Sequence, residues 1–190
     1  MKDRHFAGYA LTQGFTLAGI FAYVSGTPFV YQSIYGVSPQ LFSVLFGMNG
    51  IGLMIGTQLV GRFVDTVSET RFLKIGLSMS IAASITLLAV VLFKGPLWAV
   101  VIPIFFFVSS IGIIASSSFS LAMETQGHIA GSASALLGLL PFVLGSITAP
   151  LVGIAGEQSA VPMGVIIFSA SSLALLSYYG LVKETQKSVS

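Results

Sequence analysis

The chain has 190 residues, of which 55% are hydrophobic and only 7% are charged, and its mean hydropathy is +0.96. Because a soluble domain typically carries about 25% charged residues, this composition excludes a water-exposed surface and predicts an integral membrane protein surrounded by the lipid bilayer. The formal net charge of +2 rests on few residues and gives no indication of nucleic-acid binding. The absence of cysteine excludes disulfides, thiolate metal sites and cysteine nucleophiles.

Six apolar segments are each long enough to cross a bilayer, which takes about 20 residues. The predicted spans lie near 6–31, 41–62, 72–93, 97–121, 129–155 and 161–182. Open sheets cannot sit in lipid, and long uninterrupted apolar runs do not suit barrel strands. The predicted fold class is therefore an all-α integral membrane protein, a six-transmembrane-helix bundle that forms one domain over residues 1–190.

The basic residues predict the orientation of this bundle. Seven of the eight Lys and Arg residues belong to the N-terminal end, the second connection and the C-terminal tail, which all lie on one side, whereas Lys94 lies alone on the other. Since basic residues collect on the cytoplasmic side of a membrane, both termini are predicted to be cytoplasmic.

The first span carries a polar stripe that a simple lipid anchor would not need. On a helix at about 100° per residue, five polar side chains fall within about 60° of Tyr9: Thr12, Gln13, Thr16, Tyr23 and Thr27. They could line an aqueous or substrate cavity. Alternatively, the hydroxyls bond to their own helix, and Tyr9 and Tyr31 belong to the interfacial aromatic belt. Gln13 and Tyr23 are the stronger cavity candidates because they lie deep, where an unpaired polar group costs most.

Pro28 interrupts the same span. A proline inside a helix frees a backbone carbonyl and usually produces a kink. A kink suits a moving gate, although many static membrane helices also contain proline.

The second span holds Asn49, the only asparagine, with Gly52 and Gly56 on the same face. The two glycines form a small-xxx-small pattern, which is typical of close helix packing. Asn49 could equally be a clamp between helices or a group that lines a cavity.

The connection after the second span combines glycine with charges of both signs. Gly61, Arg62 and Asp65, followed by Arg71, could form a charge cluster between helix ends at the cytoplasmic surface. The alternative is a solvated turn with ordinary topology-determining charges. Glu124, at the end of the fourth span, could pair with Arg71 or cap the next helix.

Glu124 could also form an i,i+4 pair with His128 if the helix continues, but two ligands are too few for a metal site. No metal and no cofactor are predicted, and the absence of a nucleophile–base pair argues against an enzyme. All six acidic residues map to span ends or connections. The chain by itself therefore has no evident proton carrier within the membrane.

The fifth span repeats a glycine every seven residues, at Gly131, Gly138 and Gly145. This spacing predicts a tight seam between helices, and direct contact of the seam with a substrate is the less favoured alternative. Phe142 follows Pro141, where a break in the helix is expected, and could contribute an aromatic wall to a cavity.

Several of these stretches resemble one known family. Residues 21–32 (FAYVSGTPFVYQ) and 35–40 (YGVSPQ) are similar to the seventh helix and the following loop of bicyclomycin-resistance-type (Bcr/CflA) drug exporters of the major facilitator superfamily. Residues 45–49 resemble the start of their eighth helix, and 127–136 the entry to their eleventh. Residues 61–65 resemble a degraded copy of the superfamily's cytoplasmic Gly-x-x-x-Asp signature, whose later glycine and paired basic residues are missing.

The resemblance implies a multi-pass protein of the bacterial inner membrane that exports small amphipathic drugs in exchange for protons. Such transporters have twelve helices, with the substrate site between two six-helix halves. The chain matches the second half, so it is predicted to need an N-terminal half, which usually supplies the proton-titrating acid. Under this reading Gln13, Thr16, Tyr23, Thr27, Asn49 and Phe142 line the substrate cavity. The alternative is a self-contained six-helix protein that dimerises and acts in assembly or regulation without transport.

Overall fold

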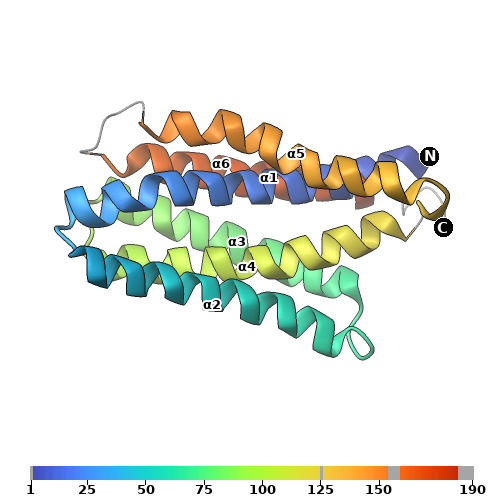
Figure 1. Ribbon diagram of the computed structural model, residues 1–190, viewed down its shortest axis with the longest axis horizontal. Helices are drawn as coiled ribbons and strands as arrows, with labels where there is room; N and C mark the ends of the chain where they lie inside the picture. Colours follow the sequence, from blue (N-terminus) through green and yellow to red (C-terminus); the bar gives the residue numbers. More distant parts are fainter. Residues whose placement is uncertain (1, 125, 154–158, 184–190) are drawn as a thin grey trace.

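The computed structural model describes residues 2–124, 126–153 and 159–183. Six long helices make up most of it: α1 (Lys2–Pro28), α2 (Pro39–Phe63), α3 (Glu69–Leu92), α4 (Leu97–Met123), α5 (Ala130–Val152) and α6 (Val161–Ser177). Three short helical segments are η1 (Phe29–Ile34, a π-helix), η2 (Gly127–Ile129, a 3₁₀-helix) and η4 (Tyr178–Lys183, a π-helix). The described ranges contain no strand, and the prediction of an all-α bundle is confirmed (Figure 1).

Within the described residues, five helices are long and apolar enough to cross a membrane: α2, α3, α4, α5, and α6 together with most of η4. The sixth long helix, α1, is not among them. Its polar stripe lowers its hydropathy, although its 27 residues exceed the length that a bilayer requires.

The helices are arranged around α1 and α4. α1 packs against α4, α5 and α6, whereas α4 packs against α1, α2 and α3, and α3 also contacts α6. In the most apolar stretch of α4, 67% of the residues are buried, against 28% in α2 and 22% in α5. α2 and α5 therefore form opposite edges of the bundle, as Figure 1 shows.

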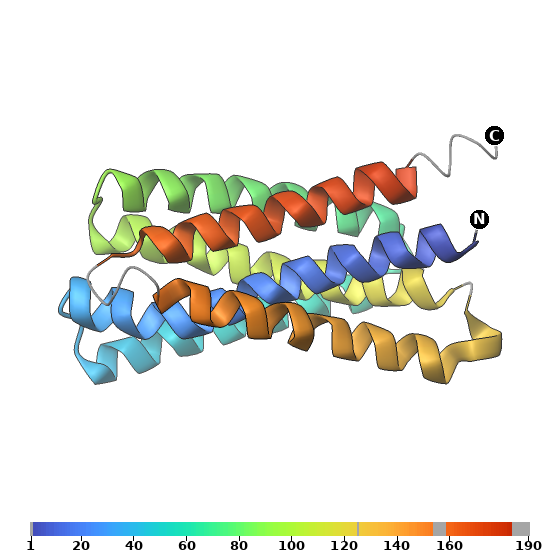
Figure 2. The same cartoon turned by 90° about the horizontal axis from the view of Figure 1, so that it is seen from above.

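Both ends of the described chain lie at one end of the bundle, together with the α2–α3 and α4–α5 connections (Figures 1 and 2). Arg62 and Arg71 belong to this end. The α1–α2 and α3–α4 connections lie at the opposite end, and the second of these contains Lys94.

The backbones of α2 and α4 approach each other closely. A Cβ atom added at Gly56 would collide with the backbone carbonyl oxygen of Ser109, and one added at Gly112 would collide with that of Leu53. Gly52 faces the same helix, where an added Cβ would meet Ser109 Oγ and the ring of Phe105. Since three glycines line the contact, the two backbones can approach until main chain touches main chain.

The seven-residue glycine repeat of α5 does not act as one seam inside this bundle. Gly145 faces α1, where an added Cβ would lie 2.6 Å from Cγ of Phe21. An added Cβ at Gly131 or Gly138 would meet no described atom within 4 Å. The repeat places all three on one stripe, but only Gly145 lies where a neighbouring helix covers that stripe.

Replacement of Gly145 by alanine is expected to destabilise the bundle by about 1–3 kcal/mol, because Phe21 must move to admit the new methyl group. Gly138→Ala is the matched control, and it should stabilise the helix by up to about 1 kcal/mol, the difference in helix propensity. Thermal unfolding in detergent measures both effects. Equal stabilities of the two variants would show that Phe21 does not pack tightly on α5.

Two local expectations are corrected by the backbone. α5 runs through Pro141 without a break. α4 ends at Met123, and the chain forms a separate 3₁₀ turn at Gly127–Ile129, so Glu124 and His128 are not spaced along one α-helix. The helix also continues past Pro28, but as the π-helix η1. A proline and a π-helical turn are both recognised causes of helix irregularity.

Candidate functional site

The polar stripe of α1 faces the interior of the bundle. Tyr9, Thr12, Gln13, Thr16, Tyr23 and Thr27 are all buried. The burial follows from the position of α1, which has α4, α5 and α6 around it. The structure does not place Tyr9 in an interfacial aromatic belt, because Tyr9 packs in an apolar cluster with Leu73 and Tyr178.

The threonines of the stripe use their hydroxyls locally. Thr12 donates to the carbonyl of Gly8 at 2.8 Å, Thr16 donates to that of Thr12 at 2.8 Å, and Thr27 donates to that of Tyr23. Bonding to the preceding turn is the usual way for a threonine to satisfy its hydroxyl inside a helix. These threonines are thus satisfied without a ligand.

Tyr23 and Asn49 connect α1 to α2. The Asn49 side-chain Nδ2 donates to the Tyr23 hydroxyl at 3.0 Å, and both residues are buried, at 2% exposure each. The ring of Tyr23 stacks on Phe46, with centroids 5.4 Å apart and planes 12° apart. The structure therefore brings together two of the predicted site residues. Asn49 joins two helices, as the clamp interpretation predicts, and it does so through a residue that is itself a cavity candidate.

Tyr31 extends this cluster. Its side chain is fully buried and its ring packs edge-to-face on Phe42, with centroids 6.2 Å apart. Asn49 lies close to it, although the Tyr31 hydroxyl makes no hydrogen bond of normal geometry in the described chain. Sequence reasoning did not select Tyr31 as a site residue because it follows Pro28 near the end of a span, where tyrosines usually face the interface.

Four buried polar atoms have no hydrogen-bond partner among the described residues: Gln13 Oε1, Tyr31 OH, Ser117 Oγ and Ser118 Oγ. They belong to α1, η1 and α4. Most buried polar groups in proteins are paired, so unpaired ones indicate where water or a polar ligand can bind. The run of three serines at 116–118 within an apolar span was the available sequence signal for the α4 pair.

The remaining predicted site residues lie on the outside. Phe142 is 65% exposed on α5, and its ring packs edge-to-face on Phe21 at 5.7 Å. In the predicted charge cluster the residues are all exposed: Gly61, Arg62, Asp65, Arg71 and Glu124. Such exposure leaves them accessible at the surface that also carries the chain termini.

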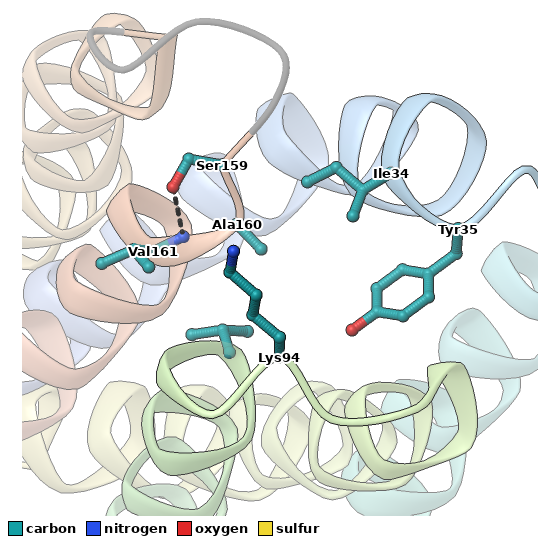
Figure 3. Close-up of a pocket in the computed structure, with 7 residues that line it drawn as sticks. Ile34, Tyr35, Lys94, Ser159, Ala160 and Val161 are labelled. Carbon is teal, nitrogen blue, oxygen red and sulfur yellow. Dashed lines mark hydrogen bonds between the residues drawn. The ribbon is translucent and has the colours of Figure 1, made fainter.

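Two cavities lie at the opposite end of the bundle. One of about 260 Å³ is lined by residues of η1, α3 and the start of α6, including Tyr35 and Lys94 (Figure 3). The other, of about 190 Å³, is lined by residues of α1, η1, α5 and α6, including Gly26 and Met163. The lining of these two cavities includes none of the six predicted cavity residues.

These features define a polytopic membrane protein whose central helices carry buried polar groups. The family model that matches is the Major Facilitator Superfamily, over residues 1–150. The chain belongs to this superfamily, whose members are carriers and not enzymes.

Two curated relatives cover nearly the whole chain. It is 54% identical over 184 residues to the uncharacterized MFS-type transporter YdgK of Bacillus subtilis (strain 168), covering 97% of this chain and 46% of that protein. It is 30% identical over 187 residues to the bicyclomycin resistance protein homolog of Haemophilus influenzae (strain Rd), covering 98% of this chain and 47% of that protein. The chain thus spans about half the length of these relatives. No solved structure matches it.

Proposed function

We propose that this chain forms the C-terminal six-helix half of a proton-coupled exporter of small amphipathic compounds. The observation that carries the proposal is the alignment of 98% of the chain with about half of a bicyclomycin resistance protein homolog. The substrate site then lies between this half and an N-terminal half. The bacterial inner membrane, with both termini in the cytoplasm, is the proposed location.

Exposed small residues on α2 and α5, at the edges of the bundle, support the proposal of a second half. The face of α2 opposite to α4 carries an exposed stripe of mostly small residues: Ser43, Gly47, Gly50, Met54 and Gly61. α5 carries a comparable exposed stripe: Gly131, Ala135, Gly138, Phe142 and Ser146. Small residues allow helices in a membrane to approach closely. We infer that the partner half packs here, which gives Gly131 and Gly138 the seam role that they lack within this bundle.

The proposed substrate-facing groups are Gln13, Thr16, Tyr23, Thr27, Asn49 and Phe142. Tyr23 and Asn49 have the strongest support, because they bond to each other beside an aromatic group and an unpaired tyrosine hydroxyl. A stacked phenol and a primary amide offer both an apolar face and hydrogen-bonding groups, which suits an amphipathic ligand.

Proton coupling is proposed to depend on the partner half. Three acidic residues have described side chains, Asp65, Glu69 and Glu124; they lie at helix ends and connections, and none of the three is buried. An ionisable group within a membrane is costly and usually functional, and the acid that titrates during transport is proposed to belong to the partner half. The exposed cluster Arg62, Asp65, Arg71 and Glu124 is proposed to contact the partner half at the cytoplasmic surface and to influence gating. Pro28 and the η1 segment that follows α1 are proposed as the flexible point of this helix.

Co-expression tests the proposal. The chain is produced with a matching six-helix N-terminal half, and we expect the two to co-purify and to lower the accumulation of bicyclomycin in cells. Gly50→Leu should reduce co-purification several-fold because it fills the small-residue stripe. Ile51→Leu is the matched control on the exposed side of α2 and should have no effect.

Failure of the two halves to associate, together with unchanged drug accumulation, would contradict the proposal. The alternative of a self-contained dimer without transport gains no support from the relatives, which are transporters of about twice the length. If protons drive export, collapse of the proton gradient should abolish it. Continued export without the gradient would contradict proton coupling but not drug export.

A further inference from the structure

The cavity at the end of the bundle opposite to the termini is built around a lysine. Its lining consists of Ile34, Tyr35, Val91, Lys94, Ser159, Ala160 and Val161. We call it the Lys94 cavity. Figure 3 shows the Lys94 side chain extending across it toward Ala160 and Val161, with Tyr35 on the other side.

The backbone at Lys94 takes a conformation that favours glycine. Lys94 has φ = 50°, the one positive value at a non-glycine residue in the described chain. It ends α3 in a Schellman motif, in which Gly95 N donates to Val90 O at 2.9 Å and Lys94 N to Val91 O at 3.4 Å. Glycine normally occupies this position because a side chain there is strained. The ammonium group of Lys94 is thus carried on a backbone conformation that costs a lysine more than it costs a glycine.

The cavity is held in shape by a contact between two connections. The Tyr35 hydroxyl donates to the carbonyl oxygen of Gly95 at 2.7 Å, which joins the α1–α2 connection to the α3–α4 connection. Partial burial raises the pKa of Tyr35 above its ordinary value, so the phenol stays protonated and able to donate at physiological pH.

Among the described residues that line the cavity, the positive charge of Lys94 has no matching acid. The lysine ammonium faces the first turn of α6, and a helix N-terminus carries a partial positive charge of its own. Two like charges repel, so Lys94 does not cap this helix. None of the seven lining residues is acidic. The arrangement is therefore complementary to an anion.

The residues around the cavity favour the binding of an anionic lipid over that of a small soluble anion. Phe93 and Trp98, on either side of the α3–α4 turn, are 87% and 60% exposed. Exposed aromatic residues at the ends of spanning helices lie at the level of the lipid headgroups. Ile34, Val91 and Val161 also give the cavity an apolar wall, against which the glycerol and first methylene groups of a lipid can pack.

We propose that the Lys94 cavity binds the phosphate headgroup of an anionic phospholipid, at the membrane surface opposite to the chain termini. The lysine ammonium contacts the phosphate, and the start of α6 adds the positive end of its helix dipole.

The test measures thermal unfolding of the full chain in detergent micelles, co-produced with its partner half if stability requires it. Phosphatidylglycerol should raise the midpoint temperature more than phosphatidylcholine does. Lys94→Gln should weaken the apparent binding of phosphatidylglycerol about tenfold, the usual scale for loss of one charge-assisted contact. Lys74→Gln, which removes an exposed lysine at the other end of α3, should bind like the unaltered chain.

Lys94→Gly separates binding from folding. It relieves the strained backbone, so its midpoint in phosphatidylcholine should equal or exceed that of the unaltered chain, while the response to phosphatidylglycerol is lost. An equal rise with inorganic phosphate alone would overturn the choice of a lipid. No response of the unaltered chain to phosphatidylglycerol would overturn the proposal.

Discussion

Substitution of Gly112 by alanine should destabilise the bundle by about 3 kcal/mol or more, near the upper end of the usual cost of overpacking. The added Cβ atom would collide with the backbone carbonyl of Leu53 and would lie 2.9 Å from the backbone nitrogen of Thr57. A side chain can change rotamer to make room, but a helix backbone cannot, so α2 and α4 must separate. Gly56→Ala should have a comparable effect, because its Cβ would collide with the backbone of Ser109.

Chemical or thermal unfolding in detergent measures this effect, with Gly47→Ala and Gly50→Ala as controls on α2. Both control sites have no described atom within 4 Å of an added Cβ, so alanine there should be neutral or stabilising by up to about 1 kcal/mol. Similar stabilities for Gly50→Ala and Gly112→Ala would mean that α2 and α4 do not touch through their backbones.

The second large effect is expected at the Tyr23–Asn49 pair. Tyr23→Phe removes the acceptor of the Asn49 hydrogen bond and leaves a buried amide without its partner, which should cost about 1–2 kcal/mol. Asn49→Leu leaves the Tyr23 hydroxyl unpaired and should cost about the same. The double variant should cost less than the sum of the two, because replacement of both partners by apolar groups leaves neither one unsatisfied.

A double-mutant cycle on unfolding free energies gives this coupling directly, and Tyr35→Phe, whose hydroxyl bonds elsewhere, is a control that should show no coupling to Asn49. Additive costs for Tyr23→Phe and Asn49→Leu would exclude the bond as an energetic unit. In the assembled exporter, Tyr23→Ala should change the substrate profile more than the abundance of the protein. A pure loss of abundance would make Tyr23 a packing residue only.

Much of the fold follows from the sequence, since hydropathy and helical length depend on local composition. The run from Leu97 is apolar enough to predict α4, and the sparse charges leave a membrane as the only suitable solvent. The continuity of α5 through Pro141 could not be predicted in this way. A proline removes one hydrogen bond, and whether the helix bends or breaks depends on the neighbours that support it.

The candidate site was predictable in part. The spacing of the stripe from Tyr9 to Thr27 correctly places these side chains on one face of α1. The sequence could not decide what that face meets. In the structure it meets other helices, and Thr16 and Thr27 are satisfied by their own helix, while Tyr23 finds a partner 26 residues away in Asn49.

By itself, the sequence determined a polytopic all-α membrane protein with a polar first helix, and its motifs indicated the superfamily, because these properties depend on composition, periodicity and short patterns. Only the tertiary structure decided which glycines carry the packing. Gly56 and Gly112 meet another backbone, whereas Gly131 and Gly138 face outward. The physical reason is that a glycine has no side chain whose polarity or size would indicate whether the position is packed or exposed. Its role therefore depends on which atoms the fold brings within contact distance.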